Sequence, residues 1–339
     1  MKDLSLTLAD PPSPPDQTYT TMGDLSLTLA DHTLPDDDAP SMPIIIGAGR
    51  GTTGTHLMHE ATCHMGYASI YYNLGCIPPP PPHGHATSND EAPQDIIPET
   101  YQTAADLHTR LLNKVGRSAR CVGNDGKCGS VLKFKNQTLS LLEAVITASK
   151  NDTIVALHDS PYPSLIPYII KSVKVIHGTP PVILLSERDP VEYTNRRAQS
   201  HGGRDLMCKN STSIDQNTLE GGAFDIIGCI DRALSGLSLE DASKIQLGDI
   251  FSTMKQIYND KQEDGLDEIA KEIKEYQDAV RGKADFALDA FAREGRTKSE
   301  DLAAEIASKV GALQVGPVAC DFVNHWRRTK IGSIGAQGR

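Results

Sequence analysis

A short apolar run followed by a glycine-rich turn constrains the fold of this 339-residue chain more than any other feature. Residues 44–46 are three isoleucines, typical of a strand buried on both faces, and GAGRGTTGT follows them at 47–55. A helical stretch then runs from about Thr55 to Met65. In such a strand–turn–helix unit, the backbone N–H groups of the turn and the helix N-terminus attract an anion. The sequence therefore predicts an anion-binding loop at 47–55.

Later segments alternate between strand and helix. Three strands and two helices are expected, with strands at 67–72, 153–157 and 182–185 and helices at 138–149 and 165–173. Asp189 precedes Pro190, which is an N-cap with proline at the first helical position, so a further helix should run through Arg197. This alternation predicts an α/β fold, with a parallel sheet covered by helices on both faces.

Apolar residues recur near the C-terminus at three- and four-residue steps. They are Leu266, Ile269, Ile273, Tyr276 and Val280. This period places them on one face of a helix, so they predict a packing stripe and not a cofactor-binding motif. We expect the helical C-terminal part to pack against the sheet.

The first 42 residues differ in composition from the rest. They hold one lysine, eight aspartates, several prolines and two copies of DLSLTLAD, at 3–10 and 24–31. This composition predicts a disordered acidic arm with a net charge of −7, which leaves −4 of the total −11 for the remainder. The acidic balance argues against a nucleic-acid binder. We expect one α/β domain at 43–325, with a proline-rich insertion at 78–98 and a tail at 326–339.

No apolar run approaches the roughly 20 residues of a membrane helix, and the N-terminus lacks the layout of a signal peptide. A cytoplasmic protein without a membrane span is therefore expected. The seven cysteines include no Cys-x-x-Cys pair, so neither a zinc ribbon nor a disulfide scaffold is indicated. Cys121 and Cys128 flank a glycine-rich turn and could be bridged in an oxidising compartment, but two reduced thiols are the favoured interpretation.

The loop lacks the residues that are typical of two common nucleotide-binding loops. An ATP-type P-loop ends in Gly-Lys-Ser/Thr, whereas Thr55 and His56 follow Gly54 here. The dinucleotide pattern Gly-x-Gly-x-x-Gly also fails, because Thr52 stands where its third glycine would be. Neither of these two ligand classes matches the loop.

Three segments, in order, resemble the P-loop sulfotransferase family over residues 44 to about 201. Thr53-Gly54-Thr55 is similar to the family's 5′-phosphosulfate loop, and Arg188-Asp189-Pro190 after a strand resembles its 3′-phosphate segment. Residues 155–167, VALHDSPYPSLIP, resemble its strand-end Asp-x-Pro segment. The resemblance implies an α/β P-loop-type domain. It also implies sulfuryl transfer from 3′-phosphoadenosine 5′-phosphosulfate (PAPS) to a hydroxyl or amine of a small-molecule or glycan acceptor, without a metal.

The resemblance also assigns roles to residues. Asp159 would be the base that takes the acceptor's proton. His158 is the second choice, because its side chain should point to the opposite face of the strand, where it would be a packing group. The nucleotide would be held by Gly49, Arg50, Gly51, Thr52, Thr53, Gly54, Thr55, His56, Arg188 and Arg196.

Two positions depart from the family pattern. Thr52 stands where a lysine or arginine normally precedes Thr-Gly-Thr, so Arg50 is expected to reach the bridging oxygen instead and to act in catalysis. Arg196 stands where a serine is common. It would either bind the 3′-phosphate by a charge-assisted contact or be a solvated base on the helix face.

Other interpretations stay open. One is a P-loop nucleotide or metabolite kinase, which the absent lysine disfavours, and another is a non-catalytic protein of this fold. His56, Glu60 and His64 share a helix face that could hold a metal, although a polar face is favoured. Tyr162 would line the acceptor pocket or pack. The sequence predicts neither the acceptor nor an oligomeric state.

Overall fold

The structure is a computed structural model, and every structural statement below concerns the residues that it describes. These are 43–51, 53–72, 74–77, 99–118, 129–149, 155–201, 206–208, 226–253, 263–289, 291, 298–310 and 321–324. The acidic arm, the proline-rich insertion, Cys121, Cys128, Thr52 and the tail at 326–339 lie outside them.

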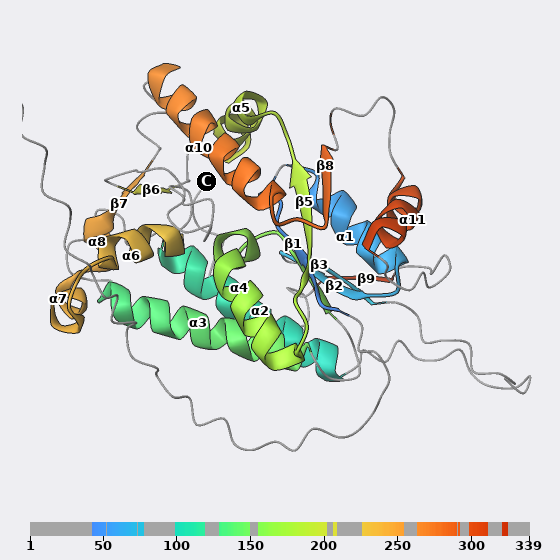
Figure 1. The fold of residues 1–339 in the computed structure, drawn as a ribbon, viewed down its shortest axis with the longest axis horizontal. Helices are drawn as coiled ribbons and strands as arrows, with labels where there is room; N and C mark the ends of the chain where they lie inside the picture. Colours follow the sequence, from blue (N-terminus) through green and yellow to red (C-terminus); the bar gives the residue numbers. More distant parts are fainter. Residues whose placement is uncertain are drawn as a thin grey trace, which may run out of the picture. The chain divides into compact units, whose positions relative to one another are not determined.

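A seven-stranded sheet with the order β8-β5-β1-β4-β2-β3-β9 forms the centre of the described fold (Figure 1). The first five strands in that order are parallel, whereas β3 is antiparallel to both β2 and β9. The strands are β1 (Ile45–Gly47), β2 (Ala68–Tyr71), β3 (Leu74–Ile77), β4 (Val155–His158), β5 (Val182–Glu187), β8 (Phe286–Asp289) and β9 (Asp321–Asn324). The strands β6 (Leu206–Cys208) and β7 (Phe251–Thr253) pair with each other in a separate antiparallel sheet.

Helices cover both faces of the sheet. Alternate residues of β1 point into two different hydrophobic clusters, because successive side chains of a strand face opposite ways. Ile46 joins the cluster built with α2 (Glu99–Ser118), α3 (Val131–Ala148), α4 (Ile166–His177) and α10 (Glu263–Arg281). Ile45 joins the cluster built with α1 (Thr55–His64) and α11 (Ser299–Val310). The predicted α/β class with a mostly parallel sheet is therefore confirmed.

Five further helical segments complete the described elements. They are the 3₁₀ turn η2 (Tyr162–Leu165), α5 (Pro190–His201), α6 (Ile226–Leu234), α7 (Leu239–Lys244) and α8 (Leu247–Ile250). The Asp189 N-cap is confirmed, since its Oδ1 accepts a hydrogen bond of 2.9 Å from the Glu192 backbone N–H. The C-terminal stripe is confirmed as packing, with Ile269 and Ile273 buried in α10.

The structure extends two of the expected elements. The helix expected at 138–149 begins at Val131, because Val131 and Phe134 are also buried and continue its apolar face. The C-terminal part is not only helical, since β8 pairs with β5 and β9 pairs with β3. No described helix is long and apolar enough to cross a membrane.

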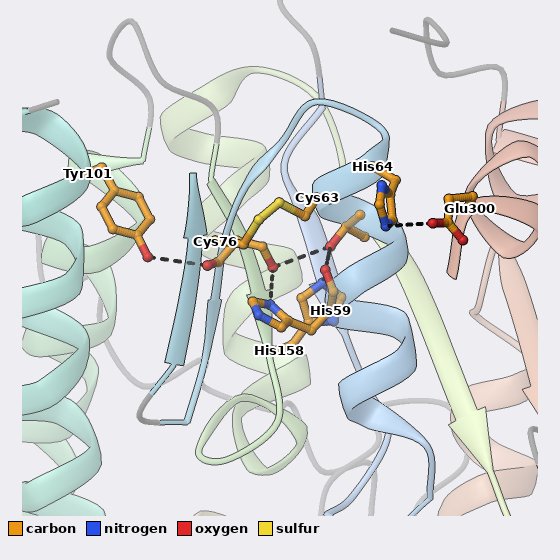
Figure 2. Close-up of a disulfide and its surroundings, with 9 residues drawn as sticks. His59, Cys63, His64, Cys76, Tyr101, His158 and Glu300 are labelled. Carbon is orange, nitrogen blue, oxygen red and sulfur yellow. Dashed lines mark hydrogen bonds and ion pairs between the residues drawn. A yellow bond between two sulfur atoms is a disulfide. The ribbon is translucent and has the colours of Figure 1, made fainter. Parts of the chain in front are cut away.

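A disulfide joins Cys63 of α1 to Cys76 of β3, with 6.1 Å between the Cα atoms (Figure 2). Cys229 is also disulfide-bonded. These bonds contradict the expectation that the cysteines form no disulfide scaffold, whereas the expectation of reduced thiols at Cys121 and Cys128 falls outside the described residues. Cysteine spacing alone did not reveal the pair, because it forms only when α1 packs over the β2–β3 hairpin. Disulfides persist mainly in oxidising compartments, so the bonds count against the predicted cytoplasmic location.

Candidate functional site

The carboxyl ends of β1, β4 and β5 lie at one edge of the sheet. The chain leaves β1 towards β2 on one side, whereas it leaves β5 towards β8 on the other. In open α/β sheets, ligands bind in the crevice outside such a topological switch point. Three predicted segments end here, because β1 leads into the glycine-rich loop, β4 into Asp159 and β5 into Arg188.

The glycine-rich loop enters α1 through a left-handed residue. Gly54 is the N-cap of α1 with φ 95° and ψ 17°, a conformation that glycine adopts without steric cost, and no side chain caps the helix. The Thr53 hydroxyl donates to the Arg50 carbonyl at 2.5 Å and lies 2.9 Å from Ser186 Oγ on β5. This hydroxyl therefore fixes the loop against β5. The uncapped amides of the first helical turn are the groups suited to an anion.

A cleft of about 300 Å³ lies beside this helix start. Its lining combines loop residues with two arginines from the other side of the switch point. The lining residues are Gly54, Thr55, His56, Tyr71, Arg188, Arg196 and Phe291. The structure thus brings together the two ends of the predicted nucleotide site. The volume of the cleft is at the lower limit of ordinary ligand pockets.

Several contacts orient Arg188 in this cleft. Its guanidinium carbon lies 4.0 Å from the centre of the Phe291 ring, and its Nε lies 3.5 Å from a Glu192 carboxylate oxygen. The side-chain amide of Gln277 donates to the Arg188 carbonyl at 2.9 Å. A guanidinium held in one orientation binds a phosphate with a smaller loss of side-chain entropy.

Asp159 is not one of the residues that line the cleft. It is 8% exposed, has φ 61°, and its carboxylate interacts by hydrogen bonding with the Tyr71 hydroxyl, which does reach the cleft. Burial raises the pKa of the Asp159 carboxyl, and the Ser160 N–H, Arg197 and the Tyr71 hydroxyl partly oppose that rise. A carboxyl whose pKa is raised towards neutral is suited to proton transfer.

His158 lies on the side of the sheet that α1 covers (Figure 2). It is fully buried, its Nε2 lies 2.9 Å from Thr62 Oγ1, and a Cβ added at Gly47 would lie 2.2 Å from its Nδ1. Burial lowers the pKa of His158 to about 3, so the ring is neutral at physiological pH. This position fits the packing role that was expected as the alternative for His158.

Arg50 does not line the cleft. Its guanidinium carbon lies 4.3 Å from the centre of the Tyr276 ring, in a small space that Thr53 and Ser186 also line. Tyr276 is itself fixed by a 2.7 Å hydrogen bond to the Ala48 carbonyl. A contact between Arg50 and a bridging oxygen stays a prediction that requires this stacking to open.

Two of the three histidines of α1 lie beside carboxylates. His56 Nδ1 lies 3.2 Å from Glu60, and His64 Nε2 lies 3.9 Å from Glu300 of α11, as Figure 2 shows for the second pair. In the part of the chain that the structure describes, no group of three or more His, Cys, Asp and Glu residues is placed to hold a metal. Tyr162 packs, since it is buried and its hydroxyl lies 2.6 Å from His108 Nδ1.

Sequence reasoning missed Tyr71, Phe291 and Arg197 as residues of this region. Tyr71 had a usable signal, because it ends a predicted parallel strand, and it pairs with His158 in the sheet register. Phe291 had none, because the chain brings it to Arg188 only through β8. Of the two remaining described loop residues, Gly49 lies against Ser186, and Gly51 faces Arg197 and Asp159.

Comparison of the chain with protein-family models and with curated proteins found no match in either case. The geometry of the cleft is therefore the main guide to function.

Proposed function

We propose that this chain is a P-loop-type sulfotransferase that moves a sulfuryl group from PAPS to a hydroxyl or amine acceptor. The observation that carries the proposal is the shared cleft. The uncapped start of α1 and the guanidinium of Arg188 line one cavity of about 300 Å³, as a ligand with a phosphate group at each end requires. The resemblance of the three segments to the sulfotransferase family gives the nature of that ligand.

The lining residues fit the two ends of PAPS. Arg188 and Arg196 provide two positive charges for a 3′-phosphate, and the amides that begin α1 provide donors for the 5′ end. PAPS supplies the sulfuryl group and, as leaving group, adenosine 3′,5′-bisphosphate. The donors at the loop would stabilise the negative charge that develops on the 5′-phosphate as its bond to sulfur breaks.

The transfer also needs a base near the cleft that takes the acceptor's proton. Asp159 is proposed for this task, because its carboxylate interacts by hydrogen bonding with Tyr71 at the cleft wall and burial raises its pKa. As the acceptor oxygen or nitrogen bonds to sulfur, its proton would pass to the Tyr71 hydroxyl, which would give its own proton to this carboxylate. Positioned bases of this kind contribute about 10²- to 10⁴-fold to rate.

A thermal-shift comparison tests the nucleotide site. Adenosine 3′,5′-bisphosphate should raise the melting temperature more than ATP, ADP or NAD, with about 2.7 kcal/mol of stabilisation at a hundredfold excess over Kd. Arg188→Gln should remove most of this shift, whereas Arg110→Gln, which changes an exposed arginine on α2, should leave it unchanged.

Transfer of labelled sulfate from PAPS to phenols, alcohols, amines and glycans then tests the reaction. Sulfation of any acceptor class supports the proposal. Binding of the bisphosphate without sulfation would leave a non-catalytic protein, and Mg²⁺-dependent transfer of phosphate from ATP would identify a kinase. Each of the last two results would overturn it.

A further inference from the structure

The glycine-rich loop lacks a positive charge at the position where one is expected. Thr52 stands where the resembling loops carry lysine or arginine, and the Arg50 guanidinium stacks on Tyr276 outside the cleft. A 5′-phosphate would then meet backbone amides without a nearby cation from the loop itself. A cation at that end of the ligand would strengthen binding, because charge-assisted hydrogen bonds are about twice as strong as neutral ones.

Arg197 of α5 reaches this loop from a different part of the chain. A Cβ added at Gly51 would lie 3.2 Å from Arg197 Nη1 and 3.3 Å from Asp159 Oδ1. Both distances are shorter than most Cβ contacts in proteins, so a side chain at this position would displace the guanidinium and the carboxylate by a few tenths of an ångström. The arginine and the carboxylate therefore meet at the same loop residue.

The anchoring of α5 explains how two successive arginines serve two places. Tyr193 and Thr194 are buried, so these two positions determine which side of α5 faces the rest of the protein. Adjacent residues of a helix point about 100° apart. With this anchoring, Arg196 lines the cleft and Arg197 lies at Gly51.

We infer that Arg197 supplies the positive charge of the glycine-rich loop and binds the 5′-phosphate group of the nucleotide, in place of the base missing at Thr52. The inference rests on the proposed function. It assigns the two ends of the ligand to different arginines, with Arg188 at the 3′-phosphate and Arg197 at the 5′-phosphate. Arg197 also lies close enough to Asp159 to favour its ionised form.

Three nucleotides separate these assignments. Calorimetric titration of the full chain would use adenosine 3′,5′-bisphosphate, adenosine 3′-monophosphate and adenosine 5′-monophosphate. Arg197→Gln should weaken binding of the bisphosphate and the 5′-monophosphate by about ten- to a hundredfold, the loss typical of a charge-assisted hydrogen bond. It should leave the 3′-monophosphate unaffected. Arg188→Gln should show the opposite selectivity, weakening only the ligands with a 3′-phosphate.

Three further variants complete the test. Arg110→Gln is the matched surface control, and Arg197→Met, which keeps an unbranched apolar stem, replaces the glutamine variant if that variant has a lowered melting temperature. Arg197→Lys keeps the charge and should restore part of the lost affinity. A merely structural role for Arg197 would weaken all three ligands equally, and that result, or no loss at all, would overturn the inference. If the unaltered protein binds none of the three ligands, the proposed function fails, and the inference fails with it.

Discussion

The Arg188 guanidinium lies 4.0 Å from the centre of the Phe291 ring, and both side chains line the cleft. The ring is half exposed, so its outer surface adds little to the core. Its contact with the guanidinium is a cation–π interaction, which holds the charge in place at the carboxyl end of β5. The site depends in this way on a residue beyond β8 that sequence reasoning did not find.

Loss of the Phe291 ring should weaken binding at the 3′ end only. An exposed cation–π contact contributes about 0.5–1 kcal/mol, so Phe291→Ala should weaken adenosine 3′,5′-bisphosphate by a factor of about two to five. Phe291→Tyr keeps the aromatic face and should bind normally. Calorimetric titration measures both effects. An equal loss for adenosine 5′-monophosphate would show that the ring acts on another part of the ligand.

Asp159 and Tyr71 should act as a unit in proton transfer. Because Asp159 does not itself line the cleft, Asp159→Asn should lower turnover by about 10²- to 10⁴-fold while adenosine 3′,5′-bisphosphate still binds. Tyr71→Phe should lower turnover by about 10²-fold or more, within the range of a general base. The double variant should lose no more than Asp159→Asn alone, because residues that act together are not additive.

Steady-state turnover with saturating PAPS measures these effects. Tyr72→Phe is the matched control, since Tyr72 is the next residue and its side chain is exposed. Full activity of Asp159→Asn would remove this carboxylate from the mechanism. Multiplying losses in the double variant would show that the two side chains act separately.

The buried His158 should make stability fall in mild acid. Burial lowers the pKa of His158 to about 3 from its ordinary value of 6.5. Between these values the unfolded chain binds a proton that the folded protein does not, so the free energy of unfolding decreases as pH falls below 6.5. The slope should approach 1.4 kcal/mol per pH unit. His158→Gln, which can keep the hydrogen bond to Thr62, should lack this contribution.

Denaturant unfolding of both proteins at pH 7, 6, 5 and 4 provides the measurement. Other groups titrate in both proteins, so the difference between them isolates His158. Parallel curves would mean that the folded protein protonates His158 as readily as the unfolded chain does.

Local sequence signals predicted the centre of the fold well. The isoleucine run at 44–46 marks a strand that is buried on both faces, and Asp189 before Pro190 marks a helix start. Both features can be recognised from residues that are adjacent in the sequence. The strand β8 was missed because its four residues, FALD, form no continuous run of β-branched apolar residues of the kind that marks β1. Its pairing with β5 is a tertiary contact.

The candidate site was predicted in part for the same reason. Loop residues such as Gly54 and the strand-end Arg188 follow from motifs that are continuous in sequence. Arg197 was predicted only as a helical residue, because nothing nearby in the sequence shows that its guanidinium meets Gly51. Motif reasoning likewise placed Arg50 at the ligand, whereas the ring of Tyr276, on a distant helix, holds it elsewhere.

The disulfide between Cys63 and Cys76 should make a measurable contribution to stability. It closes a loop with a sequence separation of 13 residues, and a loop of about this length restricts the unfolded chain by about 3 kcal/mol. The double variant Cys63→Ala, Cys76→Ala should therefore unfold with a free energy lower by roughly that amount. Reductant should lower the free energy of unfolding of the unaltered protein more than that of the double variant.

Peptide mapping without reductant provides the independent check. A peptide pair joined through Cys63 and Cys76 should appear in the unaltered protein and separate on reduction. Because the bond joins the last turn of α1 to β3, its loss should act on the helix that begins at the glycine-rich loop. Free thiols at both positions in protein purified from an oxidising compartment would contradict the bond, and with it the argument against a cytoplasmic location.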